Sequence, residues 1–305
     1  MTSQVIQAPA SPPQLTCWRP PLPPGAEECW ANVDGVWVRY IRAGSGPAIV
    51  LVHGMLGYSF SWRLTFPALT RNRTVIAIDL PGAGFSDRAT HLDHSLRPTA
   101  HRFLRFAESI GLTAFDAVAT SHGGAVAMMA AAECGNAGSP VKIERLILVA
   151  PVNPYSAHGK WLAPFLGGKI GSTLFRAVVP MMPAMHDFWH RRMFGDRGRI
   201  PPDSMGGYRA ALAIPGLFDH GLRIVRTWTQ DLQRLEGALP KIANVPVFLM
   251  WGEKDGAVYA SSAAPLAKHF KRAETVIFPG AGHLPYEECP EEFNRALVAY
   301  LERES

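Results

Sequence analysis

The sequence lacks long apolar runs and blocks of like charge. None of its apolar stretches reaches the roughly 18 residues that cross a bilayer, and the N-terminus has no apolar segment of the signal-peptide kind. The net charge of +5 is diffuse, although residues 151–240 hold 11 Lys and Arg against 6 Asp and Glu. We therefore expect a cytoplasmic protein without stable membrane insertion. The lack of a basic run argues against a nucleic-acid partner.

Cysteine is also scarce. The four cysteines are Cys17, Cys29, Cys134 and Cys289, and they form neither a CxxC pair nor a zinc-like spacing. This pattern favours free thiols in a reducing compartment. A bridge between Cys17 and Cys29 in an oxidising compartment is an alternative that the sequence leaves open.

Motifs for cofactors and metals are incomplete. Two Gly-x-Gly pairs, at 82–84 and 280–282, complete neither a G-x-G-x-x-G fingerprint nor a P-loop, so we expect no nucleotide cofactor. His186 and His190 have the i, i+4 spacing of a helical metal site, but the glutamate of H-E-x-x-H and a third ligand are missing. We therefore predict no metal.

What is present indicates a globular α/β domain. Hydrophobic residues make up 48% of the 305 residues, enough for a buried core. Short apolar runs alternate with stretches of helical periodicity, which favours a mostly parallel sheet covered on both faces. The predicted strands cover residues 36–41, 48–52, 74–78, 115–120, 146–149, 245–251 and 275–278, and the predicted helices cover 99–110, 123–134 and 291–301.

The alternation stops between residues 155 and 240. This stretch has no strand-like run, is rich in Trp, Phe, Met and Arg, and is repeatedly interrupted by proline. We interpret it as a helical cap inserted into the sheet domain; an ordinary helical subdomain packed for stability is the alternative. The predicted organisation is a Pro-rich, extended leader (1–26), a core in two pieces (27–154 and 241–305) and a cap (155–240).

Ser121 lies between a predicted buried strand and a helix of small residues. A strand-to-helix turn of this kind is typical of a nucleophile elbow, in which a strained serine exposes its hydroxyl. Strand and helix approach closely there, so the flanking residues must be small. Ala119, Gly123 and Gly124 meet this need, although Ala119 replaces the first glycine of G-x-S-x-G and its methyl group must be accommodated.

A serine hydroxyl needs a base to become nucleophilic. His283 lies in a glycine-rich loop after the last predicted strand, at the carboxyl edge where open parallel sheets bind ligands. Asp255 follows the preceding strand at the same edge and would orient the imidazole. Glu253 is the competing carboxylate, which we interpret as a solvated loop residue.

An acyl-transfer site also needs backbone N–H donors for the oxyanion. One donor is expected from His122, the residue after the predicted nucleophile. The other is expected from the loop after the first buried apolar run, where Met55 is favoured and Leu56 is the alternative. The side chain of His122 is not expected to take part in catalysis.

Together these motifs resemble the α/β-hydrolase superfamily from about residue 29 to residue 305. The resemblance rests on His53-Gly54 after a strand, residues 79–87 (DLPGAGFSD), the turn at Ser121, Trp251-Gly252-x-x-Asp255 and Gly282-His283, in the chain order Ser, Asp, His. It implies an eight-stranded, mostly parallel sheet with a helical cap after the sixth strand. Residues 79–87 resemble a structural loop of the superfamily, and we assign them to backbone shape.

The superfamily hosts many reactions, so the nucleophile must indicate the class. Ser121 argues against haloalkane dehalogenases and epoxide hydrolases of this fold, which use aspartate. The resemblance implies an esterase or lipase-like serine hydrolase that cleaves carboxylic esters through an acyl-enzyme, and the apolar cap favours an apolar acyl or alcohol group. Carbon–carbon bond hydrolases, perhydrolases, aminopeptidases and acyltransferases have similar sites, and a non-catalytic ligand-binding protein is a further alternative. The expected partner is a small ester-like molecule, and no sequence feature sets the oligomeric state.

Overall fold

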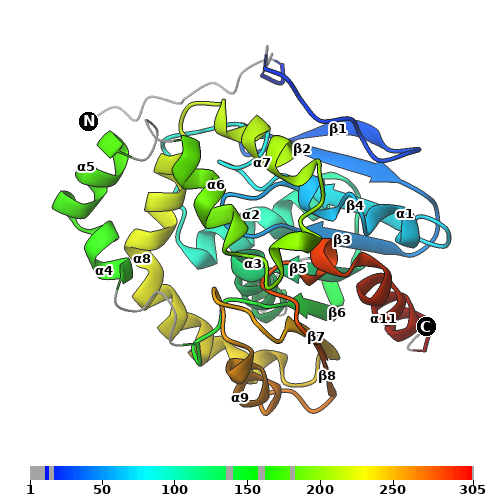
Figure 1. The fold of residues 1–305 in the computed structure, drawn as a ribbon. Coiled ribbons are helices and arrows are strands. Elements are labelled where there is room, and N and C mark those ends of the chain that lie inside the picture. Colours follow the sequence, from blue (N-terminus) through cyan, green and yellow to red (C-terminus); the bar gives the residue numbers. More distant parts are fainter. Residues whose placement is uncertain (1–10, 14–16, 135–139, 157–161, 179–182, 304–305) are drawn as a thin grey trace.

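The sheet is the centre of the molecule. The computed structural model describes residues 11–13, 17–134, 140–156, 162–178 and 183–303. Within these ranges, eight strands form one sheet in the order β1-β2-β4-β3-β5-β6-β7-β8 (Figure 1). β2 pairs antiparallel with both β1 and β4, and every other neighbouring pair is parallel. The eight-stranded, mostly parallel sheet expected from the sequence is confirmed.

Strands and helices alternate outside the inserted segment. The strands are β1 (Glu27–Val33), β2 (Val36–Ala43), β3 (Ala48–Val52), β4 (Thr74–Ile78), β5 (Ala114–Thr120), β6 (Lys142–Val149), β7 (Val247–Gly252) and β8 (Ala273–Phe278). The helices are α1 (Phe66–Leu69), α2 (Leu96–Ser109), α3 (Ser121–Glu133), α9 (Ala263–Ala267), α10 (Pro285–Glu288) and α11 (Pro290–Arg303), with short 3₁₀ turns η1 (Ser59–Trp62), η4 (Leu239–Ile242) and η5 (Ala260–Ser262).

The core lies on both faces of the sheet. Successive residues of a strand point to opposite faces, and β5 shows the result: Ala117 and Ala119 pack into one cluster and Val118 into the other. α2 and α3 cover the first face, and α1 and α11 cover the second. A strand buried on both faces needs apolar residues throughout, which is why the central strands appear in the sequence as unbroken apolar runs.

Between β6 and β7 the chain leaves the sheet. This segment contains α4 (Leu162–Gly167), α5 (Lys169–Val178), α6 (Pro183–Arg191), η3 (Arg197–Arg199), α7 (Ser204–Leu212) and α8 (Leu217–Ala238), and its described residues include no strand. α8 packs against α2, α3 and α4. No helix in the described part of the chain combines the length and apolar character needed to cross a membrane.

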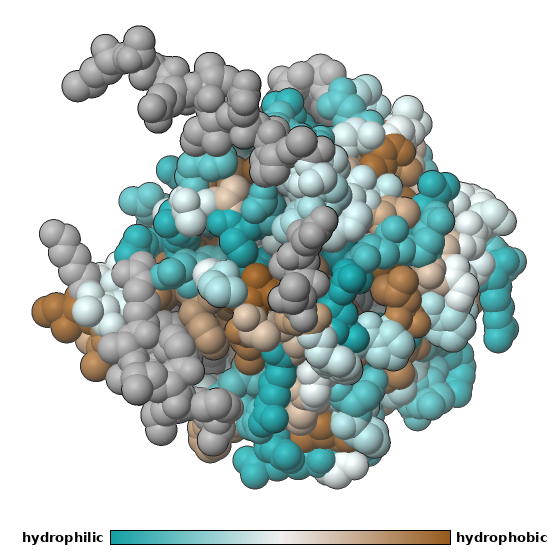
Figure 2. All heavy atoms as spheres, turned by 90° about the horizontal axis from the view of Figure 1, so that it is seen from above, coloured by the Kyte–Doolittle hydropathy of each residue, from teal (hydrophilic) through white to brown (hydrophobic). Residues whose placement is uncertain are grey.

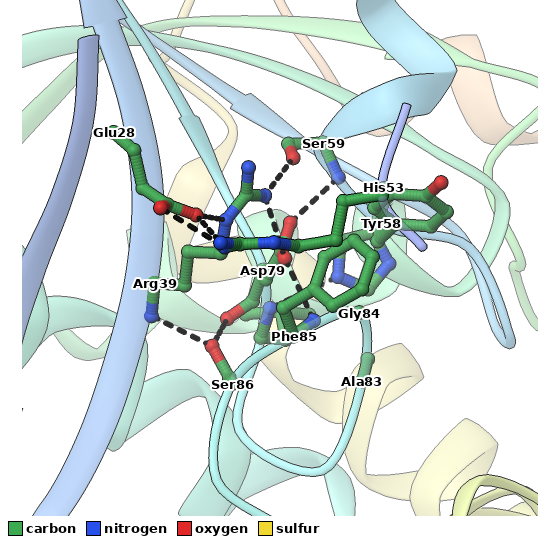
Figure 3. Close-up of polar contacts among 12 residues, drawn as sticks. Glu28, Arg39, His53, Tyr58, Ser59, Asp79, Ala83, Gly84, Phe85 and Ser86 are labelled. Carbon is green, nitrogen blue, oxygen red and sulfur yellow. Dashed lines mark hydrogen bonds and ion pairs between the residues drawn. The ribbon is translucent and has the colours of Figure 1, made fainter. Parts of the chain in front are cut away.

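The loop after β4 is held by a buried carboxylate (Figure 3). Asp79 accepts hydrogen bonds from the main-chain N–H of Ser59 at 2.7 Å and of Phe85 at 2.9 Å. The Nη1 atom of Arg39 lies 3.1 Å from the same carboxylate, and Arg39 also pairs with Glu28 of β1. These contacts join β1, β2, η1 and the loop, in agreement with a structural role for residues 79–87.

Candidate active site

Ser121 occupies a sharp turn between β5 and α3. Its φ of +52° lies in the left-handed region, which costs energy for a residue with a Cβ atom. A Cβ atom on Gly123 would lie 2.3 Å from the carbonyl oxygen of His53, so only glycine allows this close approach. Ala119 is completely buried, and the core accommodates its methyl group. A strained serine and a close approach of strand and helix are both features that a nucleophile elbow requires.

Asp255 is the carboxylate that contacts His283. Its Oδ2 atom lies 2.8 Å from Nδ1 of His283, and its Oδ1 atom accepts hydrogen bonds from the N–H groups of Ala257 at 2.8 Å and Val258 at 2.9 Å. A carboxylate accepts here, so the imidazole proton resides on Nδ1 and Nε2 keeps a lone pair. Glu253 instead accepts from the N–H of Gly280 at 2.9 Å.

Ser121, His283 and Met55 line one cavity of about 360 Å³. That volume lies within the range of small-molecule sites. Apolar residues of the inserted segment, including Trp228, contribute to its wall. Trp189 lines the cavity and is also 54% exposed, so the apolar lining continues to the protein surface. Figure 2 shows hydrophobic and hydrophilic side chains next to each other on the face seen from above.

The two predicted oxyanion donors belong to the turn after β3 and to the first turn of α3. His122 is the second residue of α3, where main-chain N–H groups lack a partner within the helix. Met55 lies in the tight turn closed by the hydrogen bond from Gly57 N–H to the carbonyl of Gly54 at 3.0 Å. A Cβ atom on Gly54 would lie 3.0 Å from Cβ of Ser121, which shows how closely this turn approaches the serine.

His53 and His122 are two further buried histidines, in the two segments that approach each other at Ser121. The ring of His122 stacks on Trp228 with 6.4 Å between the ring centroids, and burial lowers the pKa of His122 to about 4. Nε2 of His53 accepts from the N–H of Leu80 at 2.9 Å, so its Nδ1 carries the proton and donates to the carbonyl of Gly54 at 2.7 Å. Burial also lowers the pKa of His53. His53 thus connects the turn after β3 to the loop after β4.

Ser61, Tyr208 and His190 also line the cavity, and we call these three residues the polar wall. They come from η1, α7 and α6, and each is at most 8% exposed. Behind them, Glu287 of α10 accepts a hydrogen bond from the hydroxyl of Tyr208 at 2.6 Å and pairs with Arg63 at 3.0 Å.

Sequence reasoning missed the polar wall and its buried carboxylate. The parts lie far apart in the chain, and no local pattern marks them as a group. The one available signal is that Glu287 follows His283 by four residues, in the short helix α10.

His190 belongs to this network. Its Nε2 atom lies 3.0 Å from Oγ of Ser204, and its ring stacks on His186 with 6.0 Å between centroids. In the part of the chain that the structure describes, no group of three His, Cys, Asp or Glu side chains is arranged to hold a metal ion. The four cysteines carry no disulfide.

Comparison with known proteins defines the class. The model of the Alpha/beta hydrolase family matches residues 49–296, and the chain belongs to that family. It is 30% identical over 270 residues to the magnesium-chelatase 30 kDa subunit of Rhodobacter capsulatus, which covers 87% of this chain and 90% of the relative. It is 25% identical over 264 residues to monoacylglycerol lipase abhd6-A of Xenopus laevis, covering 85% of this chain and 77% of the relative.

A solved structure with the same fold is that of a membrane phospholipase A. It matches with a TM-score of 0.73 and 26% sequence identity, over 91% of this chain and 86% of that chain. The names of these three proteins cover different activities. Family membership therefore establishes the hydrolase fold, and the reaction has to be argued from the site.

Proposed function

We propose that this chain is a serine hydrolase that cleaves carboxylic esters through an acyl-enzyme. Ser121 is the nucleophile, His283 the general base and Asp255 the residue that orients the imidazole. The observation that carries the proposal is the 2.8 Å contact from Nδ1 of His283 to Asp255, because it leaves Nε2 as the basic nitrogen in a cavity that Ser121 also lines.

The reaction follows from this arrangement in two halves. Nε2 of His283 takes the hydroxyl proton as Ser121 Oγ bonds to the ester carbonyl carbon, and the N–H groups of Met55 and His122 stabilise the oxyanion. The carbon–oxygen bond to the alcohol then breaks, and His283 returns the proton to the leaving oxygen. In the second half, His283 deprotonates water, which attacks the acyl carbon, releases the acid and restores Ser121.

The inserted segment acts as a cap over this site. Trp189, Trp228 and Leu232 place aromatic and aliphatic surface on the cavity, which favours a substrate with an apolar acyl group. The relative named as a monoacylglycerol lipase adds support for ester cleavage. Carbon–carbon bond hydrolysis, perhydrolysis and acyl transfer could use the same three residues.

A fluorophosphonate probe tests the nucleophile. We expect labelling of the native protein and of Ser109→Ala, which alters a surface serine, and no labelling of Ser121→Ala. Hydrolysis of a chain-length series of p-nitrophenyl esters, repeated with an alcohol in competition with water, then separates a hydrolase from an acyltransferase. A site that hydrolyses only charged or strongly polar substrates would contradict the apolar acyl group.

A further inference from the structure

The polar wall is held rigidly in the cavity. Tyr208 and His190 come from the inserted segment, whereas Ser61 belongs to η1 of the sheet domain. The main chain of η1 is fixed by the hydrogen bond from Ser59 N–H to Asp79, two residues before Ser61 (Figure 3). Polar groups that are fixed and buried in a cavity are the ones that orient and select a substrate.

Glu287 determines which way the hydroxyl protons of this wall point. Tyr208 has a single O–H, and its oxygen lies 2.6 Å from Oε1 of Glu287 and 3.0 Å from Oγ of Ser61. A hydrogen bond to a carboxylate is the stronger of the two. Tyr208 therefore donates to Glu287, and Ser61 donates to the phenol oxygen. Ser61 keeps only lone pairs for a ligand.

The same carboxylate sets the tautomer of His190. Oγ of Ser204 donates to Oε2 of Glu287 at 2.8 Å, so Ser204 must accept from Nε2–H of His190 at 3.0 Å. Burial lowers the pKa of His190 to about 4, so the ring is neutral at neutral pH. Its Nδ1 atom then carries a lone pair and is the second acceptor of the wall.

The polar wall and His283 line the same cavity, and the carboxylate behind the wall follows His283 in the chain. Glu287 belongs to α10, which begins two residues after His283. The leaving oxygen receives its proton from His283, so the alcohol part of an ester must lie beside this loop. The apolar Trp228 instead stacks on His122 of the helix that carries the nucleophile, and the acyl chain fits along that side.

The geometry points to a subsite for the free hydroxyl groups of the leaving alcohol, so that the preferred substrate is a monoester of glycerol or another neutral polyol. This inference rests on the ester hydrolysis proposed above. The free hydroxyl groups of the polyol donate to Ser61 Oγ and to Nδ1 of His190. A methyl ester or another plain alkyl ester has no such hydroxyl group and leaves both acceptors unpaired. A phosphorylated headgroup is disfavoured. Its negative charge would face the lone pairs of Ser61 and His190, and the carboxylate of Glu287 lies behind them.

Three esters of decanoic acid test the subsite: the glycerol monoester, the methyl ester and the glycerophosphate monoester. We expect the native protein to show the highest kcat/KM on the glycerol monoester. His190→Phe and Ser61→Ala each lower that value by roughly 5- to 10-fold, as expected for one lost hydrogen bond, and leave the methyl ester within about 2-fold. Methyl-ester turnover also reports whether each variant is folded.

His101→Phe and Ser109→Ala, on the outer side of α2, are the matched controls and keep the native preference. The subsite is refuted, with ester hydrolysis intact, if the native protein does not prefer the glycerol monoester or if His190→Phe and Ser61→Ala slow all esters equally. Fastest turnover of the glycerophosphate ester also refutes it. Failure to hydrolyse any ester, together with no labelling of Ser121 by fluorophosphonate, overturns the proposed function and the subsite with it.

Discussion

Nδ1 of His283 lies 2.8 Å from Oδ2 of Asp255, although 27 residues and a full strand separate the two in the chain. The other oxygen of the carboxylate is held by two main-chain N–H groups, so the acceptor cannot rotate away from the imidazole. This pair fixes the tautomer on which the proposed base depends, and the first prediction concerns its removal.

Asp255→Asn should nearly abolish turnover while the protein stays folded. The N–H₂ group of an amide in that position donates to Nδ1 of His283. The imidazole proton then resides on Nε2, so Nε2 has no lone pair with which to accept the proton of Ser121. Comparable changes lower kcat by roughly 10⁴-fold. Glu253→Gln is the matched control: the side chain of Glu253 accepts from the N–H of Gly280 and not from His283, and its variant should retain native kcat. Equal losses in both variants would contradict the assignment.

Gly123→Ala should destabilise the turn that holds Ser121. The added methyl would lie 2.3 Å from the carbonyl oxygen of His53, and neither α3 nor β3 can move without disturbing the core. We expect a lower Tm and a loss of activity. Gly237→Ala, in α8, places its methyl in open space and should stabilise the protein by about 0.5–1 kcal/mol. A thermal melt of both variants checks the contrast.

Glu288→Ala should weaken the contact between the inserted segment and the loop of His283. Its carboxylate accepts from the N–H groups of Gly195 at 3.0 Å, Asp196 at 2.7 Å and Gly282 at 2.8 Å. Leaving these donors unpaired should cost at least about 3 kcal/mol in urea unfolding. Glu291→Ala, at the exposed start of α11, should change stability by less than about 0.5 kcal/mol. A native midpoint for Glu288→Ala would show that the contact contributes nothing.

Stability should decline in mild acid because several histidines are buried in the neutral state. Burial lowers the pKa of His94, His122 and His190 to about 4, below the value of about 6.5 in an unfolded chain. Between these values the unfolded chain binds more protons, so the free energy of unfolding falls as the pH drops from 6.5 towards 4. Each histidine contributes a slope of about 1.4 kcal/mol per pH unit.

Urea unfolding between pH 5 and pH 7.5 measures this slope. His94→Asn removes one buried imidazole, which lies 3.2 Å from that of His220, and should reduce the slope by about one proton. An unchanged slope in the variant, or stability independent of pH in the native protein, would contradict the assignment of a neutral buried ring.

The central strands could be predicted because burial on both faces requires apolar runs, as in β3 and β4. β1 was missed for the opposite reason: it is an edge strand that begins with Glu27 and Glu28, and only two of its seven residues are buried. α2 begins at Leu96, three residues before the predicted start, because Pro98 lies in its first turn, where no intrahelical N–H is needed.

The residues of the candidate site also divide into those that the sequence predicts and those that it does not. Ser121, Asp255 and His283 could be proposed from the sequence because each lies within five residues of the end of a strand, which local sequence marks. The structure brings Asp255 to His283 and places Ser121 and His283 on one cavity. The polar wall was missed because its members meet only through the packing of the inserted segment on η1 and α10. Tertiary contacts of this kind leave no local pattern in the sequence.

The short helix α10 combines two duties. The proposed proton donor lies two residues before it, and the carboxylate that polarises the wall lies within it, so both belong to one short stretch of chain. Exchanging Ser61 or His190 would change which alcohol departs without displacing the imidazole, whereas altering Glu287 would disturb recognition and proton delivery together. Diversification of substrate choice in this lineage is therefore expected to accumulate in η1 and the helices between β6 and β7, with the turn at 283–288 held constant.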